Sequence, residues 1–227
     1  MTREIEQLEQ RLGYHFVEAQ LLRQALTHRS VGYVNNERLE FLGDALVNFV
    51  IADLLYRLRV RAEEGALSRL RASLVREETL ARLARELSLS DVLTLGESEL
   101  KSGGYRRDSI LADAFEAVLG AVYLDGGFAA ARQVCEHLFS ALLSDLPDPD
   151  SLKDAKTRLQ EWLQARGRPL PRYEVIDESG PPHRRRFHVR AWLDDSDEVS
   201  EAHGSSRRGA EQDAAQQLLQ TLQSAHA

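Results

Sequence analysis

The spacing of the apolar residues constrains the first two thirds of this chain more than any other feature. From Ile5 to about Leu146 they recur every three or four positions, which is the period of an α-helix and not of a β-strand. We therefore predict an all-α domain of roughly seven or more packed helices. Short breaks between the predicted helices fall at Gly13 and at residues 32–35, 63–65, 103–104 and 126–127.

The helical period ends at the segment Asp145-Leu-Pro-Asp-Pro-Asp-Ser151. Two prolines among acidic residues disfavour a helix and are typical of a linker. Beyond it the pattern predicts a helix over 155–166, strands over 173–177, 186–193 and 198–205, and a closing helix over 207–224. This α-β-β-β-α order indicates a small α+β module. We expect an N-terminal domain over 1–146, a linker over 147–152 and a second domain over 153–224.

The overall charge at first disfavours a nucleic-acid partner. The chain has 29 Lys and Arg against 36 Asp and Glu, a formal net charge of −7, and a polyanion prefers a basic partner. However, residues 1–150 carry the whole negative excess, whereas residues 151–227 are formally neutral. The objection therefore does not extend to the C-terminal module.

Other protein classes are excluded by composition. Cys135 is the only cysteine, so a disulfide framework and a multi-cysteine zinc site are ruled out, and we expect an inert buried thiol there. No stretch approaches the ~18 uncharged apolar residues of a membrane helix. The N-terminal sequence MTREIEQLEQRLGY is acidic and periodic, unlike a signal peptide. We expect a cytoplasmic protein with no membrane partner.

Two groups of acidic residues interrupt the apolar pattern. Glu37, Glu40 and Asp44 fall within about 60° of one helix face, and Asp113 and Glu116 have the same i, i+3 spacing in an otherwise apolar helix. Stacked like charges repel, and an unpaired carboxylate is costly to bury, so either arrangement destabilises the fold unless a cation offsets it. Solvated helix faces are the alternative, and they fit the first group better than the second.

If the two predicted helices face each other, four carboxylates converge without a nearby histidine or cysteine. Ligation by oxygen alone suits Mg²⁺, with Mn²⁺ as a substitute. A di-iron bundle needs Glu-x-x-His, whereas Gly43 and Leu119 follow Glu40 and Glu116 at that spacing. Mg²⁺ held by carboxylates can activate water against a phosphodiester. We therefore predict phosphodiester hydrolysis.

Several segments resemble those of the ribonuclease III family. The stretch NERLEFLGD over residues 36–44 is similar to the family's signature, and KSGGYRRDSILADAFEAVLGAVYLDGG, beginning at Lys101, resembles its second conserved block. LRQALTHRS over 22–30 and EGALSRLRASL over 64–74 are also similar to family segments. The resemblance covers almost all of residues 1–224, and the nine-residue signature is highly specific.

The resemblance implies a role for each of six acidic residues. Glu40, Asp44, Asp113 and Glu116 match the family's metal-site carboxylates, and Asp44 and Glu116 match the pair treated as most directly catalytic. The accessory positions near the cleavage site and dimer interface are matched by Glu37 and Glu64.

The family's activity then becomes the expected activity. It implies a homodimer formed through the nuclease domains, and Mg²⁺-dependent cleavage of double-stranded RNA to staggered ends with 5′-phosphate and 3′-hydroxyl groups. Expected substrates are duplexes in precursors of ribosomal RNA, in some messenger RNAs and in transfer RNA precursors. Two rivals stay open: a non-catalytic RNA-binding protein with a vestigial acidic cluster, and a helical metal-dependent hydrolase of small phosphates.

The C-terminal module resembles a double-stranded RNA-binding domain. Thr157, Gln160, Glu161 and Gln164 share one helix face, from which polar side chains can reach the RNA minor groove. His183 lies at the tip of a loop similar to the family's minor-groove loop. The run 184–186 is interpreted as a solvated basic hairpin. At the start of the last helix, a cap and phosphate contacts are expected from Ser205, Ser206, Arg207 and Arg208.

Two further features of the nuclease domain are open to more than one interpretation. His28 could act as a general base, but a structural histidine near a helix end is the preferred interpretation. The loop 101–107 carries three cations and two glycines. It is either a mobile surface loop or a contact to the RNA backbone near the metal site.

Overall fold

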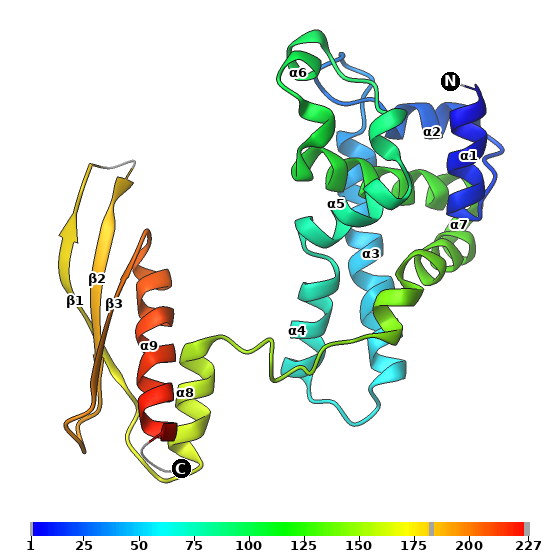
Figure 1. The fold of residues 1–227 in the computed structure, drawn as a ribbon. Helices are drawn as coiled ribbons and strands as arrows, with labels where there is room; N and C mark the ends of the chain where they lie inside the picture. The colour runs from blue at the N-terminus through cyan, green and yellow to red at the C-terminus, as the bar shows by residue number, and fades with distance from the viewer. Residues whose placement is uncertain (1, 182–183, 225–227) are drawn as a thin grey trace. The chain divides into compact units, whose positions relative to one another are not determined.

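Two compact units, residues 1–152 and 153–227, make up the chain, and each is described by itself. The computed structural model describes residues 2–181 and 184–224. Between the units, residues 145–154 form neither helix nor strand, and the two prolines there remove backbone donors that a helix would use. Figure 1 shows the helical first unit and the mixed second unit in chain order.

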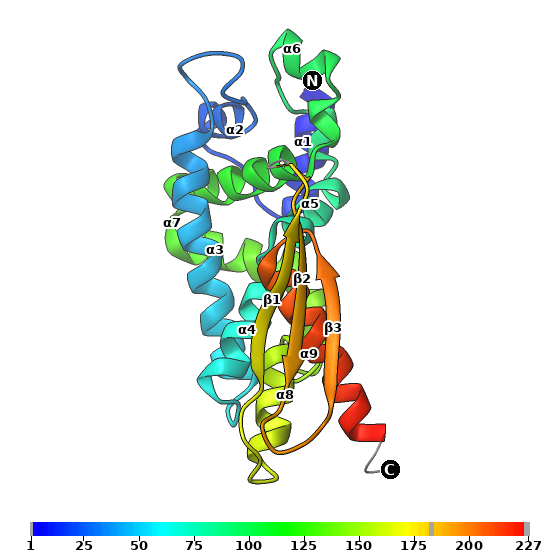
Figure 2. The ribbon, with the colours of Figure 1, turned by 90° about the vertical axis from the view of Figure 1, so that its left-hand side faces the viewer.

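The described part of the first unit is helical, as the apolar spacing predicts, apart from connecting loops and one isolated bridge between Thr27 and Thr94. The central pair is α3 (Glu37–Leu58) and α7 (Asp108–Ser144). The first half of α7 runs across α3 in both views (Figures 1 and 2). Around them lie α1 (Thr2–Leu12), α2 (Ala19–Ala25), α4 (Glu64–Leu74), α5 (Glu77–Glu86) and α6 (Glu97–Lys101), with 3₁₀ turns η1 (Leu89–Asp91) and η2 (Gly104–Arg106).

The breaks predicted from the glycines have different outcomes. α7 continues through 126–127 but kinks there, because Gly127 adopts φ 77° and ψ −178°, which lie outside the helical region. Asp125 just before the kink accepts hydrogen bonds from the hydroxyl of Tyr14 at 2.7 Å and from the backbone N–H of Val17 at 2.9 Å. The predicted break at 63–65 is only partly right, since α4 already begins at Glu64.

α7 has enough length and hydropathy to cross a membrane by composition alone, with a mean hydropathy of 1.3 over an 18-residue window. Half of that window is buried inside the protein. Leu111, Leu119 and Val122 are fully buried in the core, and the helix also carries Asp113 and Glu116. α7 is therefore a buried core helix.

Cys135 on the same helix is fully buried. Burial away from water disfavours the thiolate and raises the pKa of this thiol to about 12. The predicted burial of this thiol is confirmed.

The second unit has the predicted α-β-β-β-α order. A three-stranded antiparallel sheet in the order β1-β2-β3 packs against two helices on one of its faces (Figure 1). Its core contains Leu159, Leu163, Val189 and Leu218, all fully buried. The elements are α8 (Ala155–Gln164), β1 (Arg172–Ser179), β2 (Arg186–Trp192), β3 (Val199–Gly204) and α9 (Arg207–Ser224).

β1 extends two residues beyond its predicted end. The register of β1 against β2 shifts between Val175 and Asp177, which marks a β-bulge at Ile176. A bulge breaks the alternation of buried and exposed side chains, and residues 176–179 are all exposed. The sequence pattern therefore stops at the bulge although the hydrogen-bonded strand continues.

Candidate active site

The two acidic groups are brought together where α3 crosses α7. Two glycines permit this close approach of the helix backbones. A Cβ added to Gly43 would lie 1.8 Å from the carbonyl oxygen of Glu116, and one added to Gly120 would lie 2.3 Å from the carbonyl oxygen of Leu39. Sequence reasoning assigned neither glycine a packing role. Their interruption of apolar helical runs is the signal that could have found them, because glycine destabilises a helix interior by about 1 kcal/mol.

Three carboxylates form the centre of the site. Glu40 from α3 and Asp113 and Glu116 from α7 each place one carboxylate oxygen within 4.8 Å of the other two. All three side chains are half-buried. The convergence of carboxylates expected for facing helices is therefore present in the structure for these three residues.

The other three predicted acids lie outside this tight group. Asp44 is exposed, and its Oδ1 accepts a hydrogen bond from the Asn48 amide at 2.8 Å. Glu37, also exposed, forms an ion pair with Arg29 at 3.5 Å. Glu64 begins α4 and accepts a hydrogen bond from the Ser68 hydroxyl at 2.7 Å.

The electrostatics of the site favour a bound cation. Burial, followed by the charges of Asp44, Asp113 and Glu40, raises the pKa of Glu116 to about 8. Burial, followed by Asp113, raises the pKa of Glu40, and burial, followed by Glu77, raises that of Asp113. Each carboxyl group resists ionisation beside the others. Because the donors are all oxygens, this cluster fits a hard divalent cation such as Mg²⁺ or Mn²⁺.

The raised pKa of Glu116 predicts how stability depends on pH without metal. A carboxyl group whose folded-state pKa is raised above 4.5 contributes stability at low pH, and this contribution is lost as the pH rises toward about 8. Glu116→Gln cannot ionise and avoids the loss. In EDTA, we expect the Tm of the variant to exceed that of the unaltered chain increasingly from about pH 5 to about pH 9 by scanning calorimetry. A Tm difference that does not change with pH would contradict this prediction.

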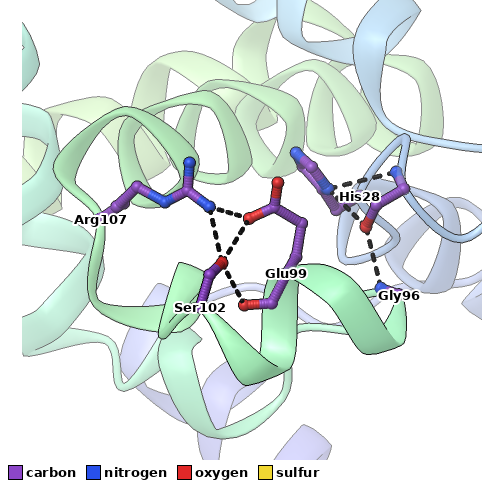
Figure 3. Close-up of polar contacts among 6 residues, drawn as sticks. His28, Gly96, Glu99, Ser102 and Arg107 are labelled. Atoms are coloured by element: carbon purple, nitrogen blue, oxygen red, sulfur yellow. Dashed lines mark hydrogen bonds and ion pairs between the residues drawn. The ribbon is translucent and has the colours of Figure 1, made fainter.

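A cavity of about 250 Å³ opens beside the acidic cluster. Glu40 and Asp113 line it together with two cations, Arg29 and Arg107. Arg107 donates to the Glu99 carboxylate and, at 3.2 Å, to the Ser102 hydroxyl (Figure 3). The predicted loop 101–107 thus places one of its cations next to the carboxylates.

His28 also lines this cavity but is engaged by the backbone. Its Nδ1 accepts the N–H of Ser30 at 3.2 Å, and the Ser30 hydroxyl accepts the N–H of Gly96 at 2.8 Å (Figure 3). Burial, followed by the charge of Arg29, lowers the pKa of His28. The imidazole therefore contacts Ser30, whose hydroxyl in turn contacts the neighbouring loop at Gly96, and this arrangement supports the structural interpretation of His28.

Comparisons with known proteins agree along nearly the whole chain. A family model described as Ribonuclease-III-like matches residues 18–142, and one described as Double-stranded RNA binding motif matches residues 155–222. A protein named Ribonuclease 3 from Nitrosococcus oceani is 57% identical over 98% of this chain and 96% of its own length. Another, from Hahella chejuensis, is 54% identical over 98% of each chain. The chain belongs to the ribonuclease III family.

The nuclease unit has a solved relative within the ribonuclease III family. A crystal structure of the ribonuclease III nuclease domain from Campylobacter jejuni is 42% identical, with a TM-score of 0.59 over 63% of this chain and 98% of that one. A second structure of the same domain concerns a region involved in its dimer formation, at 44% identity and a TM-score of 0.58 over 60% of this chain and 96% of that one.

The RNA-binding module of this ribonuclease III family member presents its predicted helix face to solvent. Gln160, Glu161 and Gln164 are exposed on α8, and Thr157 is half-buried. The carboxylate of Asp154 caps this helix by accepting the N–H of Thr157 at 2.9 Å. The ammonium group of Lys153 holds the Glu161 carboxylate at 2.6 Å, so this predicted contact carries an internal ion pair.

The start of α9 is capped as predicted. The Ser206 hydroxyl accepts the N–H of Gly209 at 3.1 Å, and the preceding Ser205 is exposed. Arg207 pairs with Glu211 at 2.8 Å, which reduces the charge available to RNA, whereas Arg208 is exposed. The remaining predicted contact, His183, lies outside the described residues.

Proposed function

We propose how this ribonuclease III family member, an endoribonuclease of double-stranded RNA, performs its reaction. Glu40, Asp113 and Glu116 would hold Mg²⁺, with Mn²⁺ able to substitute, and Asp44 would complete the site. The main support for this metal site is the convergence of three half-buried carboxylates whose oxygens lie within 4.8 Å of one another. When bound, Mg²⁺ lowers the pKa of a water molecule and offsets charge that develops on phosphodiester oxygens.

The protein's own residues position the reactants. Asp44 and Glu116 are the proposed catalytic pair, and the Asn48 amide donates a 2.8 Å hydrogen bond to the Asp44 carboxylate and so fixes its orientation. Arg29 and Arg107 line the adjacent cavity and supply donors for phosphate oxygens. Water adds its oxygen to phosphorus, the bond to the 3′-oxygen breaks, and that oxygen takes a proton. The products are 5′-phosphate and 3′-hydroxyl ends.

Two copies of the chain would cut both strands of one duplex. We propose a homodimer through the nuclease unit, in which Glu37 and Glu64 act as accessory acids near the cleavage site and dimer interface. An exposed apolar stripe on α3 supports the dimer: Phe41, Phe49 and Tyr56 are 80%, 60% and 72% exposed. Burying such a stripe against a second copy removes apolar surface from water. One site per strand accounts for staggered ends.

The C-terminal module holds the duplex for the nuclease sites. Thr157, Gln160, Glu161, Gln164 and His183 are proposed for the minor groove, and Ser205, Ser206, Arg207 and Arg208 for the phosphates. We propose that the protein acts in the cytoplasm. Its proposed substrates are duplexes in ribosomal and transfer RNA precursors and in some messenger RNAs.

Cleavage in the presence of Mg²⁺ and in EDTA tests this function. We expect the purified chain to cut a long RNA duplex with Mg²⁺, to leave it intact in EDTA and to bind it in both. Gel analysis with end labels reports the cuts and their 5′-phosphates. Binding without any Mg²⁺-dependent cut would favour the non-catalytic rival, and hydrolysis of small phosphate esters alone would favour the other.

A further inference from the structure

A basic cavity in the RNA-binding module lies apart from the helix face of α8. Its volume is about 550 Å³, and none of the described residues that line it is acidic. The lining residues come from the start of β2 and the end of β3: Arg184, Arg185, Arg186, His203, Gly204 and Ser205. We propose that this cavity binds a phosphate group of the RNA backbone. The proposal rests on the function proposed above and adds a binding site to it.

Close backbone packing fixes both walls of the cavity. On one side, a Cβ on Gly180, whose φ is +90°, would lie 2.5 Å from the carbonyl oxygen of Arg184, and the N–H of Arg184 donates to Pro181 at 2.8 Å. On the other side, a Cβ on Gly204 would lie 2.7 Å from the backbone nitrogen of Ala210. The cavity is therefore bounded by well-packed backbone on both sides.

The charges of this cavity are only partly compensated. Glu178 pairs with Arg185 at 2.6 Å. The exposed side chains of Arg184 and Arg186 make no hydrogen bond or ion pair with the part of the chain that the structure describes. Guanidinium groups present parallel N–H donors that match phosphate oxygens. Like charges this close destabilise the module unless an anion enters between them.

One histidine lines the cavity, and a second histidine packs against it. The ring of His203 stacks on that of His188, with centroids 4.0 Å apart and planes 21° apart. His188 Nε2 lies 3.0 Å from a carboxylate oxygen of Glu201. The stack orients the His203 ring, which lines the cavity.

The location of the cavity in the chain favours the RNA backbone as the source of phosphate. Arg184 to Arg186 directly follow the loop that contains His183, the proposed minor-groove contact. Ser205 directly precedes the proposed phosphate contacts at the start of α9. An RNA strand that contacts both segments would place the phosphates between these two contacts beside the cavity. Backbone phosphates are also the abundant anions that a duplex offers.

Salt dependence of duplex binding tests the proposal. The two cavity variants are Arg184→Gln and Arg186→Gln. The control is Arg172→Gln, which removes the same charge at the opposite end of the β1–β2 pair. Arg172 pairs with Asp194 there. The full chain is titrated with duplex RNA in EDTA over a series of NaCl concentrations. We expect each cavity variant to weaken binding and to reduce the slope of log affinity against log salt by about 1, and the double variant by about 2. Arg172→Gln should leave the slope unchanged.

The outcomes separate this inference from the proposed function. If the double cavity variant folds by circular dichroism and binds duplex with the slope of the unaltered chain, the cavity binds no phosphate. If the unaltered chain binds no duplex, the proposed function itself fails. Duplexes with 5′-phosphate and 5′-hydroxyl ends are run in parallel. Equal losses on both support a backbone phosphate, whereas a loss confined to 5′-phosphate ends would overturn that assignment.

Discussion

Glu116→Gln should lower the rate of duplex RNA cleavage by about a thousandfold while leaving RNA affinity unchanged. The substitution keeps the side-chain size but removes a negative ligand from the three-carboxylate cluster. A cation that stabilises charge on reacting oxygens contributes several kcal/mol, and about 4 kcal/mol corresponds to a thousandfold in rate. Single-turnover cleavage with Mg²⁺ and equilibrium binding in EDTA measure the two effects separately.

Glu136→Gln is the matched control for this experiment. Glu136 lies on the same helix beyond the kink at Gly127 and pairs with Arg132 at 2.8 Å, and it is absent from the cluster. We expect this variant to cleave at the unaltered rate. A Glu116→Gln protein that cleaves like the control would refute the assigned role, and one that loses binding and its thermal transition together would indicate unfolding.

Gly43→Ala should destabilise the nuclease unit severely. In an unobstructed helix this change stabilises by up to about 1 kcal/mol, because alanine has the higher helix propensity. Here the added methyl group would lie 1.8 Å from the carbonyl oxygen of Glu116, and neither backbone can move without disturbing the core. Overpacking of this kind costs about 3 kcal/mol or more, so the clash exceeds the propensity gain. We expect the Tm to fall by roughly 6–12 °C in scanning calorimetry.

Gly32→Ala provides the comparison for the glycine prediction. A Cβ at Gly32 meets nothing within 4 Å, and its φ lies outside the left-handed region. Its Tm should stay within about 2 °C of the unaltered chain. If Gly43→Ala were as stable as Gly32→Ala, the close crossing of α3 and α7 would be wrong.

Much of this architecture can be predicted from the apolar spacing because it records which helix faces are buried. The spacing predicts the helical unit, and the prolines and period change predict the second module. The β-bulge at Ile176 and the kink at Gly127 are harder, since each depends on tertiary contacts. The alternation of apolar and polar residues ends at the bulge, although β1 continues. The glycines near the kink indicate the end of a helix, whereas α7 continues there as one bent helix.

The candidate site was predictable in its residue types but not in its geometry. Spacing places Glu40 and Asp44 on one face, yet only the crossing of the helices shows that Glu40 joins Asp113 and Glu116 while Asp44 turns to Asn48. Arg29 carries no comparable local signal. Its place beside the carboxylates depends on how the loop before α3 packs, which sequence spacing does not encode.

The crossing of α3 and α7 separates the residues that hold the fold from those that we propose to perform the chemistry. Gly43 and Gly120 permit the contact between backbones, whereas the acids beside them repel one another. We therefore expect a single carboxylate substitution in the cluster to leave a protein that still folds and binds double-stranded RNA but no longer cuts it.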